Sequence, residues 1–253
     1  MILTVVPHTA EARTEVDYYR WDTAIKIPKS VRKIRNRRKK FLKIAASQIG
    51  YISDNANNRM SVYSKFIMDK KGITTWDYTQ YMWCSEFVSW CAYKAGLKKW
   101  VPCDSIEDWK ANYPKRIYTF SMEGHDPANK ILNIKDLKPG DIIFVSTVKD
   151  PMAEAHHTAI VERVNVKRGR VYTIEGNKRM EFFQDVKGKL GPKNKLYVAN
   201  HINTGGKRSY YKDKNGKKYR CNFKDKTDTY RGVRRTCFET SQIHEVLRLN
   251  FSR

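Results

Sequence analysis

The sequence predicts an α+β fold in which N-terminal helices pack on an antiparallel β-sheet. Residues 36–50 and 84–96 place apolar side chains at three- and four-residue intervals, and a glycine ends each stretch. This spacing is typical of helices that bury one face. Short apolar runs at 142–145, 157–166 and 171–176 follow, separated by turn residues, as in antiparallel strands. Because the helices precede the strands, the order favours α+β over alternating α/β.

The N-terminal part begins with a basic run at Lys29–Lys40 that leads into the first helix near Asn36. The run is either a solvated helix start or a contact for a polyanion, and the sequence favours neither. A second helical pattern covers residues 60–69. The polar stretch 101–136, with a short helix at 105–112, is expected to be an insertion.

The strands begin at the turn Pro139-Gly140, which starts the apolar run ending at Val145. A further strand is expected at 195–202, and residues 238–251 fit a strand or a short helix. We therefore predict three parts, which are a basic N-terminal arm (1–35), a catalytic domain (36–203) and a basic C-terminal extension (204–253).

The net charge of +24 indicates a polyanionic partner, which could be nucleic acid, an anionic membrane surface or an acidic cell-wall polymer. No apolar run approaches the roughly 18 to 20 residues that cross a bilayer, so we expect no membrane span. The first residues lack a basic segment followed by a long apolar one, so we expect no signal peptide.

The five cysteines are odd in number and show no C-x-x-C spacing. A disulfide framework or a structural zinc site is therefore not expected, although Cys221 and Cys237 could pair. Cys84 falls in the first turn of its helix, where unpaired N–H groups and the helix dipole favour a thiolate. The alternative is a small core residue, and this is our interpretation of Cys91.

A hairpin gives Cys84 its expected partners. With the turn near residues 165–167, His157 lies across from Glu175 or Asn177, which share one face of their strand. An imidazole with a carboxylate or amide behind it can take a proton from a thiol. Each residue alone could be an ordinary surface or core residue. A zinc site that also uses His156 matches no usual spacing, and we expect no metal or cofactor.

Four motifs stand in this order along the chain: Trp83-Cys84-Ser85-Glu86-Phe87-Val88-Ser89-Trp90-Cys91, Leu137-Lys138-Pro139-Gly140-Asp141-Ile142-Ile143-Phe144, His157-Thr158-Ala159-Ile160-Val161 and Ile174-Glu175-Gly176-Asn177. They resemble the motifs of the CHAP domain, the cysteine- and histidine-dependent amidohydrolase/peptidase, over residues 36–202. The resemblance implies a papain-like fold and hydrolysis of amide bonds in peptidoglycan. It also implies that Cys84 is the nucleophile, His157 the general base and acid, Glu175 the residue that orients the histidine, and Asn177 a further polar member. NlpC-type peptidases usually have a histidine as third member, so Glu175 favours CHAP.

The chain also departs from the family pattern. The segment between Cys84 and His157 is longer than usual, and residues 78–82 do not match the common sequence before the cysteine. We see no acidic calcium loop. Near the cysteine we expect Tyr81, Trp83 and His156 to contact substrate, because aromatic side chains suit a groove for sugars or peptide.

The leading hypothesis is a peptidoglycan hydrolase, either an N-acetylmuramoyl-L-alanine amidase or an endopeptidase, held on anionic wall polymers by its basic arm and tail. We expect a phage-type lysin or a virion-associated enzyme, present in the virion or the host cytoplasm before it acts at the bacterial wall, with virion proteins as further partners. The alternative is a non-catalytic protein of the same fold that binds nucleic acid or builds the virion.

Overall fold

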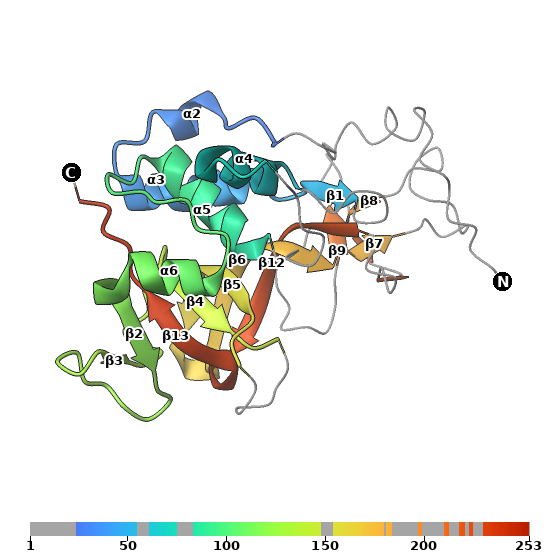
Figure 1. The fold of residues 1–253 in the computed structure, drawn as a ribbon. Coiled ribbons are helices and arrows are strands. Elements are labelled where there is room, and N and C mark those ends of the chain that lie inside the picture. The colour runs from blue at the N-terminus through green and yellow to red at the C-terminus, as the bar shows by residue number, and fades with distance from the viewer. Residues whose placement is uncertain are drawn as a thin grey trace, which may run out of the picture.

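The computed structural model describes residues 24–54, 61–74, 83–147, 154–179, 181–183, 197–198, 210–212, 218–220, 223–224 and 230–252. Its helices form one layer and its main sheet forms another (Figure 1). The α+β prediction is confirmed. No helix in these ranges is long and apolar enough to cross a membrane.

Three of the helices begin within two residues of the predicted position, each after a polar residue that caps it. Asn36 accepts a hydrogen bond from the Lys39 backbone N–H at 2.8 Å, and Ser61 and Ser105 cap their helices in the same way. Gly96, with φ of 81°, ends the cysteine-bearing helix in the left-handed conformation that glycine adopts without strain. The helices are α2 (Lys29–Arg32), α3 (Arg37–Ser47), α4 (Val62–Lys71), α5 (Cys84–Ala95) and α6 (Ile106–Asn112).

The main sheet has eight strands within the described residues, in the order β1-β12-β6-β5-β4-β13-β2-β3. Neighbouring strands are antiparallel except β2 and β3, which are parallel. The bounds are β1 (Ile52–Asp54), β2 (Ile117–Phe120), β3 (Ile131–Leu132), β4 (Ile142–Val145), β5 (His157–Asn165), β6 (Arg170–Arg179), β12 (Tyr230–Glu239) and β13 (Ile243–Leu247). Smaller sheets contain β7 (Glu181–Phe183), β8 (Tyr197–Val198), β9 (Tyr210–Lys212), β10 (Lys218–Arg220) and β11 (Phe223–Lys224).

The C-terminal strands differ from the predicted division at residue 203. β12 lies between β1 and β6, and β13 lies between β4 and β2, so strands from both sides of that boundary alternate within one sheet. Charged residues in these strands interrupt the apolar alternation by which a strand is recognised in a sequence. Arg235 on β12 forms an ion pair with Glu162 of β5, with Nε 2.7 Å from Oε2, so β12 carries a charged residue although it is an inner strand.

The predicted insertion 101–136 also contributes more than loops. It carries α6 and supplies β2 and β3 at one edge of the sheet, next to β13.

The core lies on both faces of the sheet. α5 is buried on nearly its whole circumference, with only Tyr93 and Lys94 exposed. One apolar cluster joins α3 and α5 to Ile142, Phe144 and Ile160, and the other contains the alternating residues of the opposite face. Cys91 is fully buried in the first cluster, as expected of a core residue.

Candidate active site

The first turn of α5 is held against β5 and β6 at two points. A Cβ on Gly176 of β6 would lie 2.7 Å from Phe87 Cβ and 2.7 Å from Cζ3 of Trp83, so only glycine allows this approach. The hydroxyls of Ser85 and Thr158 are 2.7 Å apart and join the helix start to β5. These two contacts fix Cys84 at the head of β5.

Cys84 shares a hydrogen bond with the imidazole of His157. Burial alone would raise the pKa of the Cys84 thiol. The charge of His157, its hydrogen bond and backbone hydrogen bonds from Thr158 and Ser85 outweigh the burial and lower that pKa below its usual value. The site therefore favours a thiolate.

His157 is buried and bonded on its far side to Glu175, with Nε2 2.8 Å from Oε2. Because Nε2 faces the carboxylate, Nδ1 is the nitrogen left to meet the sulfur. Burial lowers the pKa of His157, but the Cys84 charge and the hydrogen bonds to Cys84 and Glu175 prevail over burial and the Lys178 charge and raise it.

Glu175 is fully buried yet stays ionised. Its carboxylate accepts hydrogen bonds from Thr173 and Thr236, and Lys178 Nζ lies 3.2 Å from Oε2. Burial acts to raise the pKa of Glu175, and the Lys178 charge, His157 and Thr173 lower it far below the usual value. The carboxylate is thus an anion that can hold an imidazolium.

Asn177 lies at the edge of this group. The β5–β6 register pairs Ile160 with Ile174, and its continuation sets Asn177 opposite His157. Asn177 is buried and has a φ of 56°, a conformation that asparagine tolerates better than most residues. Its backbone carbonyl accepts a hydrogen bond from Arg231 Nη1 at 3.0 Å.

Residues 76–177 match the family model of the CHAP domain. This stretch is similar to the CHAP domain, a papain-like domain of cysteine- and histidine-dependent amidohydrolases and peptidases, so the recognition made from the four motifs is confirmed. No curated protein and no solved structure matches the chain.

Within the matched residues 76–177, the predicted substrate contacts have different outcomes. Trp83 is only 1 % exposed and packs against Tyr51 and Tyr63, so it is a core residue with no surface for substrate, and that prediction is wrong. The prediction relied on the aromatic side chain, but an indole ring packs equally well against other aromatic rings in a core. Tyr81 lies outside the described residues.

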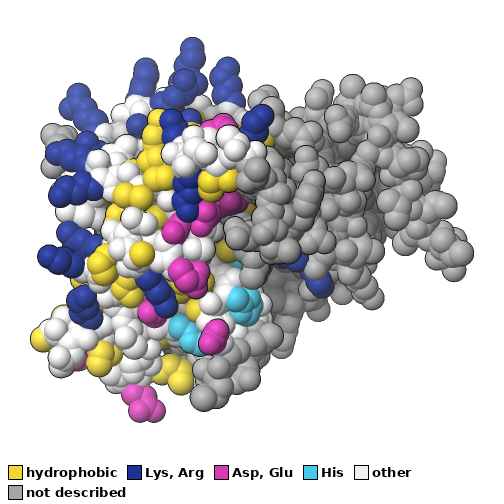
Figure 2. Space-filling view, viewed as in Figure 1, with side chains coloured by type: hydrophobic (Ala, Val, Ile, Leu, Met, Phe, Trp, Pro, Cys, Tyr) yellow, Lys and Arg dark blue, Asp and Glu magenta, His cyan; other side chains and the backbone are white. Residues whose placement is uncertain are grey.

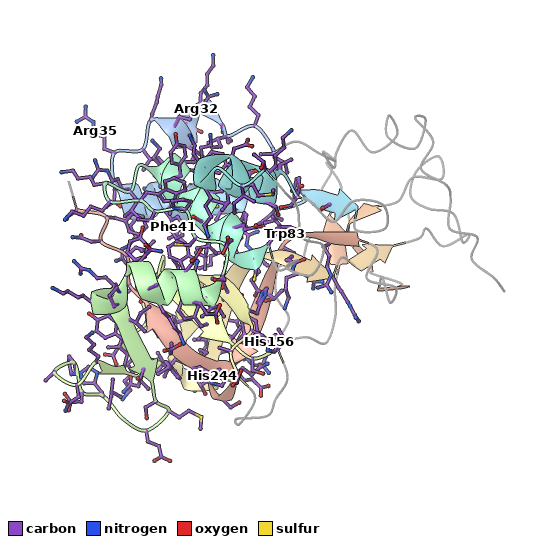
Figure 3. All side chains as sticks on the ribbon, viewed as in Figure 1. Arg32, Arg35, Phe41, Trp83, His156 and His244 are labelled. Atoms are coloured by element: carbon purple, nitrogen blue, oxygen red, sulfur yellow. The ribbon has the colours of Figure 1, made fainter. Side chains whose placement is uncertain are left out.

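His156 does not join the other polar residues. Its Nε2 lies 2.5 Å from Thr147 Oγ1, and its Nδ1 lies 3.1 Å from the Glu154 carbonyl (Figure 3). The alternative zinc site would need His156 beside Cys84, and the described residues form no cluster of three or more metal-ligating side chains.

The cysteines have separate environments. Cys84, Cys91, Cys103 and Cys237 are free thiols. Cys221 lies outside the described residues.

Three supporting residues were missed from the sequence. Thr173 stands two residues before Glu175, so strand alternation would have placed both on one face. Thr236 lies in the segment assigned to an extension, and no local pattern links it to Glu175. Glu86, in the first turn of α5, is buried and accepts a hydrogen bond from Ser64 Oγ. Burial raises the pKa of Glu86 to about 8.

Proposed function

We propose that this protein hydrolyses an amide bond of bacterial peptidoglycan, with Cys84 as nucleophile, His157 as general base and acid, and Glu175 as the residue that orients the ring. One observation carries the proposal, namely the continuous series of hydrogen bonds from Cys84 through His157 to Glu175 at a helix start. The CHAP family supports amide hydrolysis by this chemistry.

The reaction follows from the charges of these groups. The Cys84 thiolate attacks the amide carbonyl carbon, and the carbonyl oxygen takes the electron pair. When the C–N bond breaks, the His157 imidazolium gives its proton to the leaving nitrogen, and a thioester remains on Cys84. Water then gives a proton to His157 while its oxygen attacks the thioester, which releases the carboxylic acid and restores the Cys84 thiolate beside the His157 imidazolium.

The oxygen that becomes negative needs hydrogen-bond donors. We propose the backbone N–H of Cys84 for this role, because the first N–H groups of α5 and its dipole point toward the site. Asn177 would be a further polar member at the edge of the group, and His156 would meet substrate at the rim.

The substrate assignment rests on charge as well as on family. A net charge of +24 suits a wall rich in anionic polymers. We propose action at the bacterial cell wall as a phage-type lysin or a virion-associated hydrolase, of either the N-acetylmuramoyl-L-alanine amidase or the endopeptidase type, with a catalytic unit that includes the predicted 36–203 domain.

The test is digestion of purified peptidoglycan followed by mass analysis of the muropeptides. Wild-type protein should release fragments with one new amine and one new carboxyl end, and their masses identify the bond. Cys84→Ala should release none, while Cys237→Ala, a thiol removed outside the site, should cleave like wild type. Undiminished cleavage by Cys84→Ala would falsify the proposed nucleophile.

A non-catalytic protein of the same fold would need none of these groups in a reactive state. A lowered Cys84 pKa, a raised His157 pKa and a buried carboxylate behind the ring favour the enzyme.

A further inference from the structure

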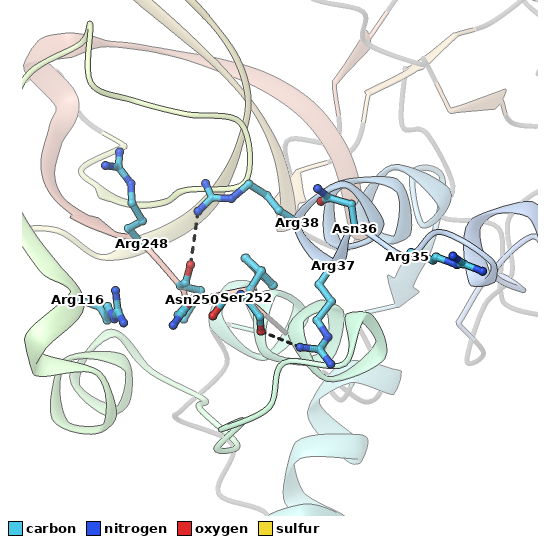
Figure 4. Close-up of a pocket in the computed structure, with 10 residues that line it drawn as sticks. Arg35, Asn36, Arg37, Arg38, Arg116, Arg248, Asn250 and Ser252 are labelled. Atoms are coloured by element: carbon cyan, nitrogen blue, oxygen red, sulfur yellow. Dashed lines mark hydrogen bonds between the residues drawn. The ribbon is translucent and has the colours of Figure 1, made fainter.

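A hollow of about 630 Å³ lies between the start of α3 and the C-terminal segment 248–252 (Figure 4). Five of its ten lining residues are arginines, and none is acidic. The arginines come from three separate parts of the chain and are Arg35, Arg37, Arg38, Arg116 and Arg248.

Among the described residues, one carboxylate forms ion pairs with these arginines. Buried Asp141 binds Arg38 at 3.2 Å and Arg248 at 2.7 Å, so one negative charge serves two guanidinium groups. Arg37 Nη1 donates to the Ser252 backbone carbonyl at 2.8 Å, a neutral acceptor (Figure 4). Asp141 therefore explains why some of these arginines are present, but not the excess of positive charge.

Arg35 and Arg116 contribute positive charge that Asp141 does not pair with. Both side chains are exposed, and neither has an ion-pair or hydrogen-bond partner for its guanidinium among the described residues. Like charges brought together around one hollow repel each other unless an anion is bound. The arrangement thus suits a ligand that brings its own negative charge.

The hollow is separate from the proposed catalytic group. In Figure 3, Arg35 lies at the left edge, whereas Trp83 and His156 lie nearer the middle, and the residues that line the hollow include no member of the catalytic group. Lys and Arg side chains gather along the upper and left edges of the face in Figure 2, over α2 and α3. A polymer bound at the hollow would leave the proposed active site accessible.

We propose that this arginine hollow binds the phosphate groups of a polyol phosphate polymer. The fork of N–H groups on a guanidinium matches two oxygens of a phosphate, which is why arginine serves phosphate recognition. The choice of a polyol phosphate over other phosphate esters rests in part on the proposed function at a cell wall.

The lining also argues against nucleic acid. Proteins that bind single-stranded nucleic acid stack the bases on aromatic side chains. Phe251 is the aromatic residue among those that line the hollow. Its ring packs on Phe41 at a centroid distance of 5.2 Å, and Arg38 lies 5.8 Å from its centroid. The ring is therefore occupied, whereas guanidinium groups remain for phosphates.

The test compares two double variants in a Cys84→Ser background, which prevents cleavage during the measurement. Arg35→Ala/Arg116→Ala removes two charges from the hollow. Lys167→Ala/Arg168→Ala removes two exposed charges from the β5–β6 turn and is the matched control. Binding of a glycerol phosphate oligomer and of a single-stranded oligodeoxynucleotide with the same number of phosphates is measured by calorimetry, and thermal unfolding verifies the fold.

We expect the hollow variant to raise the Kd for the glycerol phosphate oligomer by about tenfold, and the control to leave it within about twofold. Equal weakening by both variants would mean diffuse charge attraction and would overturn the site. Tighter binding of the oligodeoxynucleotide, weakened by the hollow variant, would overturn the polyol phosphate in favour of nucleic acid. No binding by the unsubstituted hollow would also overturn the proposal.

Hydrolysis is measured separately, with the cysteine intact. The hollow variant should cleave soluble muropeptides at the wild-type rate. With the hollow unsubstituted, cleavage of muropeptides without binding of the oligomer would overturn only the arginine hollow. Binding of the oligomer without cleavage would overturn only the proposed function.

Discussion

Gly176→Ala is the substitution for which the structure gives the clearest magnitude. The new Cβ would stand 2.7 Å from Phe87 Cβ and from Cζ3 of Trp83. Ordinary contact between carbon atoms needs roughly 3.5–4.0 Å, so α5 and β6 must separate by about 1 Å. The Phe87 contact is to a Cβ, which moves only with its backbone, so a rotamer change cannot relieve it.

Two quantities should change together. Overpacking of this kind costs about 1–3 kcal/mol of unfolding free energy, which lowers the Tm by several degrees. A displacement of about 1 Å between Cys84 on α5 and His157 on β5 should lower kcat/KM by about 100-fold.

The assay is hydrolysis of soluble muropeptides beside thermal unfolding, at a temperature where the variant is fully folded. Gly124→Ala is the control, because its closest new contact is the Ser121 side chain at 3.1 Å, in a loop away from the site. If Gly176→Ala cleaved and unfolded like wild type, the close approach of α5 and β6 would not be what positions the sulfur.

Three further predictions concern the titrating groups. Because the Cys84 pKa is lowered and the Cys237 pKa is raised, iodoacetamide should alkylate Cys84 at a pH where Cys237 does not react. Mass spectrometry of the peptides measures both reactions, and alkylation of both thiols at the same rate would contradict this. Glu175→Gln should lower kcat/KM by roughly 100-fold or more. It should also lower the pKa of His157, because the hydrogen bond to the carboxylate raises that pKa. An NMR titration of the imidazole that shows no downward shift of the pKa would oppose the orienting role. Glu86 keeps its proton in the folded state up to about pH 8 but loses it near pH 4.5 when unfolded, so the folded state binds more protons and stability falls as the pH rises through this range, by at most about 5 kcal/mol. Glu86→Gln should reduce the difference in unfolding free energy between pH 5 and pH 8, measured by urea unfolding. An unchanged difference would argue against Glu86 as its source.

Much of the candidate active-site group could be predicted, because local rules determine on which face of its helix or strand each member lies. Helical spacing set Cys84 in the first turn of α5, and strand alternation set Glu175 and Asn177 on one face. The short turn at residues 166–169 then brought His157 back to that face. These steps used neighbours along the chain, whereas the meeting of Cys84 with His157, and the role of each residue, rested on the resemblance to the family.

The errors concern contacts between distant residues. Trp83 looked suited to substrate because its side chain is aromatic, but packing against Tyr51 and Tyr63 decides its orientation. The strand β12 looked like a basic tail because its arginines interrupt the apolar alternation. Those arginines find partners such as Glu162, far away in sequence, which no local pattern reveals.

The place of β12 in the sheet has a consequence for the timing of synthesis. Thr236 reaches Glu175 from a strand that is translated 61 residues later, and β12 also pairs with β1 near the beginning of the described chain. A nascent polypeptide that still holds residues 230–247 inside the ribosome lacks two inner strands of its sheet. The sulfur, ring and carboxylate therefore become aligned only after nearly all of these 253 residues have emerged, so a prematurely released fragment should be inert.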